Sequence, residues 1–390
     1  MFEQSKGDGM NELSIDEFKT LAKKLYLAKD RKPLILLGPP GVGKTEGVYQ
    51  LAQELARELN LKFIEYDESS ADEIMADRSK YFVFLEFRLY ECEPSDFIGI
   101  PRDVNGFIVY KPLRWAQVFS TGAGLLNLDE ITNIQRPDLQ AAMYKLFERR
   151  AGFIKFHPDV IITATGNRPE DSAIATMLPA PLINRVRVFR IRAPALKEWI
   201  NYMYETRNDW DKRVAAFLAR FGQFFLEKPQ DIETLDQFAT PRAWTALADV
   251  SQKIDIEELE SLASATVGAR AGQHFVTFCK LDVPNPDEFI KDPSRLSELD
   301  VDRRYLATLQ LSTMLDQKLQ KDVSSALETF RNLLLYLNSN DREFLTLLIL
   351  MLPPNSAKKI FMKMINSEEF KGIAKHFINV FMKVKKLEGR

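Results

Sequence analysis

Short apolar runs alternate with amphipathic stretches through the first half of the chain. Strands are predicted at 33–37, 81–89, 125–128, 160–165 and 186–191, where apolar or β-branched residues form short runs. Apolar residues at helical spacing predict helices between these strands, including one from the capping-box sequence at Ser14 to about Ala28 and one over 138–148. Strands that alternate with helices predict a parallel sheet covered by helices.

The strand pattern stops after Ala193, and the rest of the chain has helical periodicity. Residues 284–293 contain three prolines among acidic residues, which predicts a linker. We therefore expect a disordered N-terminus at 1–13, an α/β core at 14–193, an α-helical lid at 194–283 and an all-α C-terminal domain at 284–390. The predicted fold class is α/β, with a parallel-sheet core and two helical additions.

Composition narrows the class of protein. The 53 basic and 55 acidic residues nearly cancel, so net charge indicates neither a nucleic-acid nor a membrane partner, although a local basic patch stays open. The longest apolar run, Leu345–Leu352, is far shorter than the ~20 residues that span a bilayer and predicts a buried helix. Cys92 and Cys279, with only three histidines, indicate no disulfide framework or zinc cluster. The first ten residues do not resemble a secretory signal, and we expect a cytoplasmic protein.

A glycine-rich loop separates the first predicted strand from the helix that follows it. Its glycines would let backbone amides approach phosphates, Lys44 would reach the terminal phosphates, and the Thr45 hydroxyl would bind Mg²⁺. The strand–loop–helix context makes a chance glycine-rich turn a poor alternative. The expected ATP-binding residues are Gly38, Pro39, Pro40, Gly41, Val42, Gly43, Lys44, Thr45 and Glu46.

Two carboxylates follow the apolar strand 125–128. Ligands of open parallel sheets bind at the carboxyl ends of the strands, where Asp129 and Glu130 are expected to lie. Asp129 would hold Mg²⁺, and Glu130 would polarise the water that attacks the terminal phosphate. Alone, such a pair is more often a solvated strand end, but the preceding phosphate loop favours the catalytic interpretation.

Three further residues are candidates for the same chemistry. Asn167 comes two residues after the predicted strand 160–165, where its amide would orient the attacking water. The alternative is that it is simply an asparagine in a turn. Arg185 lies just before the last predicted strand and would supply positive charge to a phosphoryl transition state, with Arg187 as a weaker alternative. In isolation, either arginine would be assigned to the surface.

The ordered series of motifs resembles the AAA+ superfamily, specifically its MoxR-like branch, over roughly residues 15–280. Besides the phosphate loop, the resemblance depends on Phe87-Arg88-Leu89, Asp96-Phe97-Ile98-Gly99-Ile100-Pro101, Leu128-Asp129-Glu130-Ile131, Ala164-Thr165-Gly166-Asn167-Arg168, Leu178-Pro179-Ala180-Pro181-Leu182-Ile183-Asn184-Arg185 and Thr240-Pro241-Arg242-Ala243-Trp244. Each segment alone is only moderately specific for this family, but the order in which the segments occur is specific for it.

The resemblance implies roles and partners. Asn167 would be sensor 1, Arg185 an arginine finger acting on the neighbouring subunit's ATP, and Arg242 sensor 2 on the lid. A finger that acts between subunits implies a homo-oligomeric ring, commonly a hexamer. The resemblance also implies a protein client, often one with a von Willebrand factor A domain, and Mg²⁺-dependent ATP hydrolysis.

Two inserted hairpins are also implied, near 105–110 and 152–157. Their residues Phe107, Ile108, Phe153 and Phe156 would face a central pore and grip the client; the alternative is that they pack on the sheet. Two positions depart from the family pattern: Asn127 interrupts the usually apolar strand before Asp129, and Thr132 stands where relatives often carry Asn.

Other functions stay open at this point. The last predicted helix is basic, with Lys371, Lys375, Lys383, Lys385, Lys386 and Arg390 against Glu388. This composition permits a nucleic-acid motor or a phage or defence ATPase, although a solvated helix face is the more common explanation. A nucleotide-gated scaffold that assembles and hydrolyses little is a third hypothesis, against which the intact Glu130 and Arg185 argue.

Overall fold

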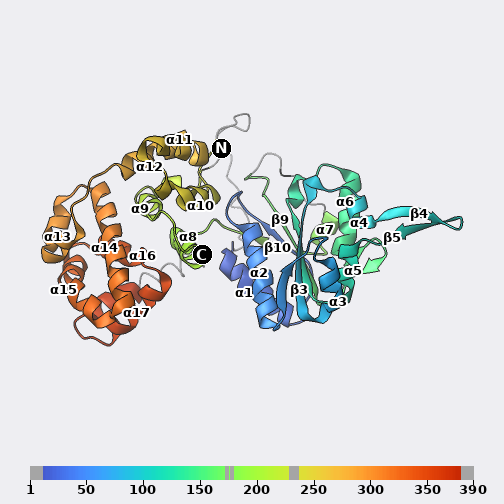
Figure 1. Cartoon of the computed structure of the whole chain (residues 1–390), viewed down its shortest axis with the longest axis horizontal. Coiled ribbons are helices and arrows are strands. Elements are labelled where there is room, and N and C mark those ends of the chain that lie inside the picture. The colour runs from blue at the N-terminus through green and yellow to red at the C-terminus, as the bar shows by residue number, and fades with distance from the viewer. Residues whose placement is uncertain (1–11, 172–174, 176–179, 228–236, 379–390) are drawn as a thin grey trace, which may run out of the picture. The chain divides into compact units, whose positions relative to one another are not determined.

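The computed structural model describes residues 12–171, 175, 180–227 and 237–378, and the chain divides into two compact units, 1–193 and 194–390 (Figure 1). The strands of the first unit are β1 (Leu34–Leu37), β2 (Lys62–Glu65), β3 (Tyr81–Arg88), β4 (Ile100–Val104), β5 (Phe107–Lys111), β6 (Gly124–Asp129), β7 (Arg150–Ala151), β8 (Ile154–Lys155), β9 (Val160–Gly166) and β10 (Arg187–Arg190). Its helices are α1 (Ile15–Leu27), α2 (Lys44–Glu58), α3 (Ala71–Ala76), α4 (Ser95–Ile98), α5 (Arg114–Thr121), α6 (Pro137–Phe147) and α7 (Ala180–Ile183).

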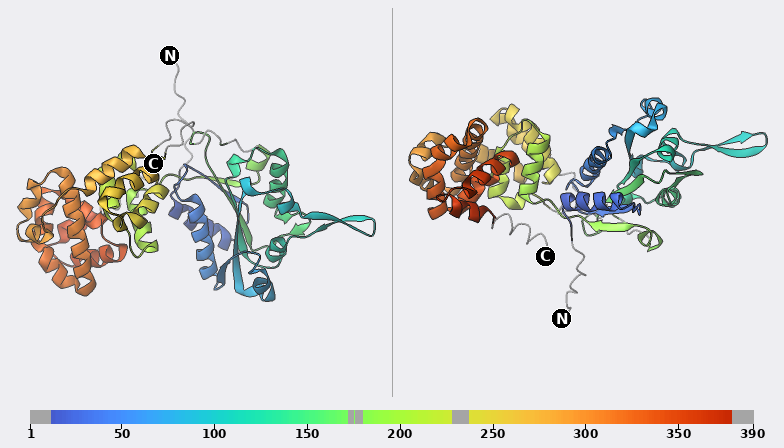
Figure 2. Two further views of the ribbon diagram at one scale, coloured as in Figure 1. Left: turned by 45° about the horizontal axis from the view of Figure 1, so that its top comes forward. Right: turned by 90° about the horizontal axis from the view of Figure 1, so that it is seen from below.

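The first unit is built on a six-stranded sheet in the order β10-β1-β9-β6-β3-β2, with every neighbouring pair parallel. Helices α1 and α2 lie on one side of the sheet, and α5 and α6 lie on the other (Figures 1 and 2). The side that faces α5 and α6 is apolar: Ile35, Val83, Leu126 and Ile162 are buried there in one cluster with residues of both helices. The α/β fold class predicted from the sequence is confirmed.

Local sequence explains where these elements begin. The predicted capping box is present: the Glu17 amide donates to Ser14 Oγ at 3.2 Å, and the Ser14 amide donates to Glu17 Oε2 at 2.8 Å. Strand β2 was not predicted, because only four residues with polar ends pair there with β3. Leu13, at the end of the segment predicted to be disordered, bridges to Ile191, while residues 1–11 lie outside the described part of the chain.

The second unit is helical in the part that the structure describes. Its helices are α8 (Leu196–Thr206), α9 (Arg213–Arg220), α10 (Pro241–Val250), α11 (Ile256–Val267), α12 (Ala269–Cys279), α13 (Pro286–Lys291), α14 (Val301–Lys321), α15 (Val323–Asn340), α16 (Arg342–Leu350) and α17 (Pro354–Ile365). The run Leu345–Leu352 is largely buried in and after α16, as predicted. None of the described helices is long and apolar enough to cross a membrane.

The linker predicted at 284–293 is wrong. Asn285 caps α13 by accepting the Asp287 amide at 3.0 Å, Pro286 occupies the first helical turn, and Phe289 is buried. Proline therefore starts a helix here instead of breaking one. One hydrophobic cluster includes buried residues from Trp199 to Phe377, on both sides of this segment. The separation of a lid at 194–283 from a domain at 284–390 stays a prediction.

Candidate nucleotide-binding site

The loop between β1 and α2 has a backbone that requires glycine. Gly41 and Gly43 have φ angles of 72° and 94°, and Gly43 caps the first turn of α2. At Gly38 a Cβ atom would lie 2.4 Å from the Ile191 carbonyl oxygen, so the loop passes too close to β10 for any side chain. The loop is thus fixed at the N-terminus of a 15-residue helix, where amides and the helix dipole attract anions.

Lys44 folds back over this loop. Its side chain is only 8% exposed, and Nζ donates to the carbonyl oxygens of Gly38 at 2.8 Å and Pro39 at 2.7 Å. It also donates to Asn167 Oδ1 at 3.1 Å, which joins the loop to the end of β9. The structure therefore brings together the candidate phosphate-binding lysine and the candidate sensor from sites 123 residues apart.

Thr45 and Asp129 form the part of the site that suits a metal ion. Thr45 Oγ1 donates to Asp129 Oδ1 at 3.1 Å, and Thr165 Oγ1 donates to the same oxygen. Hydroxyl and carboxylate oxygens are the ligands that Mg²⁺ prefers, usually together with substrate phosphates and water. Among the described residues no group of three or more His, Cys, Asp or Glu side chains is placed to hold a metal alone. The oxygen set thus fits Mg²⁺ that is bound jointly with phosphate.

Glu130 follows Asp129 in a strained backbone conformation. Its φ and ψ angles of 58° and 38° are left-handed, a conformation that costs roughly 1–2 kcal/mol for a residue other than glycine. Its Oε2 accepts a hydrogen bond from Asn133 Nδ2 at 2.5 Å, across the 3-10 helix η3 (Ile131–Asn133). The sequence did not single out Asn133, and the signal for it is only its position three residues after the carboxylate.

Thr132 explains one of the two departures from the family pattern. It is buried, and its Oγ1 accepts the backbone amide of Asn167 at 2.9 Å. A Cβ on Gly166 would lie 2.9 Å from the same hydroxyl oxygen, so the threonine fits tightly against the end of β9. Thr132 therefore fixes the backbone of the candidate sensor.

Asn127, the other departure, lies in a buried row of polar side chains across three strands. Its Oδ1 accepts from Thr163 Oγ1 at 2.9 Å, and its Nδ2 donates to Glu86 Oε2 at 3.0 Å. Burial raises the pKa of Glu86, and the nearby Asp129 carboxylate raises it further, while the Asn127 hydrogen bond opposes this. Each half of the fully buried amide has a partner, which makes a polar residue tolerable in this strand.

Arg185 lies at the opposite edge of the sheet from the phosphate loop. Arg187 pairs with Leu34, the first residue of β1, so Arg185 lies just before the amino end of the strands. The phosphate loop begins after Leu37 at the carboxyl end of β1, ~13 Å from Leu34 along the strand. The Arg185 side chain is 58% exposed and donates to Glu148 Oε1 at 2.6 Å. Arg187 instead makes two hydrogen bonds to Asp30, at 2.8 and 2.7 Å, and is held within its own chain.

Arg242 is in the second unit, on the first turn of α10. Thr240 caps this helix by accepting the Ala243 amide at 3.1 Å, and Arg242 is exposed. The cap fixes the direction in which the first turn starts.

The two hairpins predicted as insertions are present. All ten strand residues of the β4–β5 hairpin are exposed, with Phe107 at 73% and Ile108 at 66%, and the hairpin extends away from the sheet (Figures 1 and 2). Phe153 in the β7–β8 turn is 81% exposed and lies 5.8 Å from the Tyr110 ring. For Phe156 the pore-facing prediction is wrong, because it is buried against Trp115.

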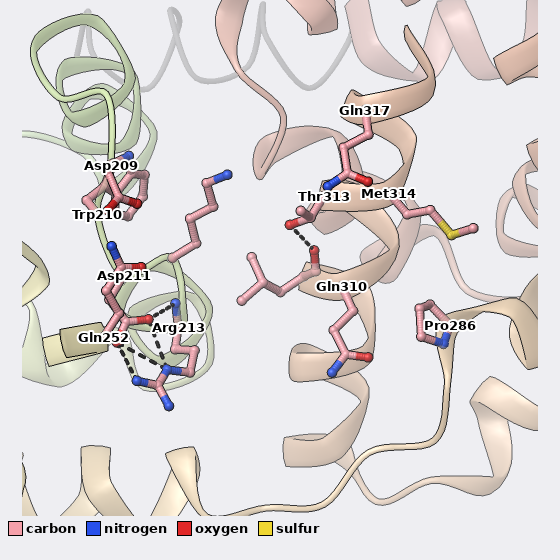
Figure 3. Close-up of a pocket in the computed structure, with 12 residues that line it drawn as sticks. Asp209, Trp210, Asp211, Arg213, Gln252, Pro286, Gln310, Thr313, Met314 and Gln317 are labelled. Carbon is pink, nitrogen blue, oxygen red and sulfur yellow. Dashed lines mark hydrogen bonds and ion pairs between the residues drawn. The ribbon is translucent and has the colours of Figure 1, made fainter. Parts of the chain in front are cut away.

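A cavity of about 490 Å³ lies in the second unit, between the residues that precede α9 and one face of α14 (Figure 3). Its carboxylate Asp211 accepts from the Arg213 guanidinium at 2.7 Å and from Ser251 at 2.8 Å. Lys212 lies 5.6 Å from the Tyr204 ring. The charges of Asp211 and Lys212 therefore already interact with neighbouring side chains.

Comparison with known proteins gives one informative match. Residues 34–193 match the family described as "ATPase family associated with various cellular activities (AAA)". No curated protein matches the chain. Among solved structures, C. elegans PCH-2 is 14% identical over 67% of each chain with a TM-score of 0.32. Thermotoga maritima RuvB is 15% identical over 73% of this chain and 81% of its own, with a TM-score of 0.30. Aeropyrum pernix ORC2 is 12% identical over 73% and 75%, with a TM-score of 0.38. Sequence identities and TM-scores this low support no conclusion about function.

Proposed function

We propose that this chain, whose residues 34–193 form an AAA-family ATPase domain, is an ATP-hydrolysing ring motor of the MoxR-like branch that remodels or activates a partner protein. The observation that carries the proposal is that Lys44, Thr45, Asp129 and Asn167 lie together at the carboxyl edge of one parallel sheet. They form two hydrogen-bonded pairs, Lys44 with Asn167 and Thr45 with Asp129. Phosphoryl transfer depends mainly on positioning and charge stabilisation, and these are the groups that supply both.

Each residue at this edge has a separate task. The backbone N–H groups of Gly41, Val42 and Gly43 would cradle the phosphates, and Lys44 places its charge between the loop and Asn167. Thr45 and Asp129 would hold Mg²⁺, which would supply positive charge at the phosphates when bound. Glu130 accepts the proton of the attacking water, and Asn167 orients that water from the end of β9.

Asn133 holds the Glu130 carboxylate in a defined place. A hydrogen bond from the amide nitrogen fixes the direction in which the carboxylate oxygens point. The Oδ1 atom of Asn133 is buried without a hydrogen-bond partner, which costs stability and is typical of residues kept for function.

Arg185 is the basis for proposing a ring. It lies at the amino edge of the sheet, so it is too far from the phosphate loop of its own chain to act there. An exposed arginine in this place meets a neighbouring subunit's nucleotide when copies pack head to tail, and such an arrangement closes into a ring, for which we propose a hexamer. Arg242 is assigned as the lid sensor by resemblance alone.

The β4–β5 hairpin is proposed as the part that grips a protein client. Exposed aromatic and aliphatic side chains gather on it and on Phe153, far more than a solvated hairpin needs. Phe107 and Ile108 at its turn are the residues proposed to contact the client. A client with a von Willebrand factor A domain is the partner that the family resemblance favours.

Replacing Glu130 with Gln tests the hydrolytic role. We expect ATP binding to persist, because the loop and Lys44 are unchanged, while turnover falls by about 10²- to 10⁴-fold with the loss of a general base. The matched control is Glu58→Gln, which makes the same change at an exposed residue near the end of α2. Nucleotide binding and phosphate release are measured separately. Turnover of Glu130→Gln near the parent rate would refute the assignment.

A further inference from the structure

A basic groove lies beside α17 in the helical unit, and it shares no residue with the nucleotide site of the first unit. It has a volume of about 670 Å³ and runs between α17 and the junction of α14 with α15. The groove residues are Gln320, Val323, Asn355, Lys358, Lys359, Met362 and Lys363. Lysines provide the only charged side chains in this lining.

Buried contacts of α17 anchor the helix, so the face that carries the groove lysines is fixed. Ser356 Oγ donates to Asp316 Oδ1 at 2.5 Å, and Gln320 Nε2 donates to Ser356 Oγ at 2.9 Å. Ile360 and Met364 are fully buried on the same side of the helix. The lysine-bearing face therefore points away from the core because the helix cannot turn about its axis.

Within the part of the chain that the structure describes, the groove lysines have no acidic partner. Among the described residues none of Lys358, Lys359 and Lys363 forms an ion pair, although Lys359 Nζ donates to Gln320 Oε1 at 3.5 Å. Asp316 on α14 is bound by Ser356, and Asp322 caps α15 by accepting the Ser325 amide at 2.7 Å. Lys359 and Lys363 are one helical turn apart, an arrangement of like charges that destabilises a helix. An anion in the groove relieves this repulsion.

We propose that this groove binds the phosphodiester backbone of nucleic acid. Lysine binds phosphate as a point charge, and glutamine and asparagine amides such as those of Gln320 and Asn355 commonly contact phosphate and sugar. Met362, 54% exposed, and Val323 provide an apolar surface between the charges. No aromatic side chain is in the lining, so bases find no stacking platform and binding is independent of sequence.

The surrounding sequence has the same charge. Residues 354–390 contain nine Lys or Arg and three Glu, whereas the whole chain has a net charge of −2. Positive charge is thus concentrated at one end of a nearly neutral protein, which is the electrostatic pattern of a local nucleic-acid contact. The overall net charge hides this local excess.

The test measures binding of the full chain to a fluorescein-labelled oligothymidylate by anisotropy over a range of salt concentrations. Three lysine–phosphate contacts contribute about −2 to the slope of log K against log salt for a single strand. We expect the triple variant Lys358→Gln, Lys359→Gln, Lys363→Gln to lose that contribution and to bind at least about tenfold more weakly at low salt. ATP turnover without nucleic acid stays unchanged, because the groove is outside the nucleotide site.

The matched control removes equal charge from exposed lysines elsewhere in the same unit: Lys253→Gln, Lys280→Gln, Lys291→Gln. A second variant, with the three groove lysines changed to Arg, keeps the charge and is expected to keep binding, and thermal unfolding shows that all variants are folded. Equal weakening in the groove and control variants, or unchanged binding of the groove variant, would overturn the proposal. Binding of polyglutamate as tightly as oligothymidylate would also overturn it, in favour of an acidic peptide.

Discussion

Asn127 shows how one unexpected residue is accommodated by its neighbours. An amide in a buried strand is costly unless both its oxygen and its nitrogen find partners, and here Thr163 and Glu86 provide them from the two adjacent strands. The same logic applies to Thr132, whose hydroxyl accepts the amide of Asn167. Both departures from the family pattern are thus parts of local hydrogen-bond networks.

Asn127→Val is expected to lower the free energy of unfolding by about 1–3 kcal/mol, because it leaves Glu86 and Thr163 without their buried partner. The triple change Asn127→Leu, Glu86→Leu, Thr163→Val removes every member of the row and should recover most of that loss. Urea unfolding of the three proteins measures both effects. A triple variant less stable than Asn127→Val would contradict this account of the row.

The candidate site was predictable from the sequence only as far as local motifs reach. Gly38–Thr45 and the pair Asp129 and Glu130 follow their strands directly, so their positions at the carboxyl edge could be predicted. The contacts of Thr165 with Asp129 and of Glu86 with Asn127 could not, because they join residues 36 and 41 positions apart through strand register. The roles of Asn167, Arg185 and Arg242 stay predictions.

At the scale of elements, the β7–β8 hairpin places two phenylalanines differently, although both were predicted from the sequence to face a pore. Phe153 is exposed at the turn, whereas Phe156, three residues later, packs 5.9 Å from Trp115 and 6.3 Å from Phe119. The two rings thus have different surroundings, because Phe153 lies in the turn itself and Phe156 follows β8.

Phe156→Ala is therefore expected to destabilise the first unit by about 3–5 kcal/mol, the usual cost of removing a buried ring. Phe153→Ala, its matched control, should change stability by less than about 0.5 kcal/mol, as surface substitutions do. Chemical denaturation gives both values. Equal destabilisation by the two substitutions would show that the turn is packed and does not present Phe153 to a partner.

Helices α8 and α16 are joined through a lysine whose charge is disfavoured by burial. Lys197 Nζ donates to the Leu350 carbonyl at 3.0 Å, and Tyr204 Oη donates to the Met351 carbonyl at 2.7 Å, both at the end of α16. Burial lowers the pKa of Lys197 to about 8, below the ~10.4 of a lysine in an unfolded chain. Between these two values the unfolded chain holds more protons than the folded one.

Stability contributed by Lys197 therefore rises as pH increases from about 8 to about 10.4, and below pH 8 it is constant because both states are protonated. We expect the wild-type protein to gain stability relative to Lys197→Met between about pH 7.5 and about pH 10. Urea unfolding of both proteins at the two pH values gives this difference, in which other titrating groups cancel. A difference that is constant, or that changes in the opposite direction, would contradict the lowered pKa.

Prediction of elements succeeded where apolar runs were continuous. Strands β3, β6 and β9 are buried on both sides of the sheet and read as such runs, whereas β2 is short, polar at both ends and at the sheet edge. The segment 284–293 was wrongly predicted as a linker because proline and acidic residues occur both in linkers and at helix starts. The burial of Phe289 identifies it as a packed helix.

At the scale of the whole molecule, the proposed ATP site lies at one edge of the sheet and Arg185 lies at the other. Thr45, Asp129 and Glu130 lie at the carboxyl edge, and Arg185 lies at the amino edge, which is why we propose that a complete site is formed by two copies of the chain. Arginine fingers of this kind raise turnover by about 10³- to 10⁵-fold. Under this proposal, ATP hydrolysis depends on assembly, because a lone subunit has no arginine finger at its own nucleotide.

Mixing two inactive variants tests this central claim most directly. Arg185→Ala subunits keep Glu130, and Glu130→Gln subunits keep Arg185, so a mixed interface can pair an intact base with an intact finger. Each variant alone should be nearly inactive, while co-assembled mixtures should recover turnover, up to about a quarter of the parent value for random rings. Turnover that stays at the level of the separate variants, despite proven co-assembly, would contradict a site shared between subunits.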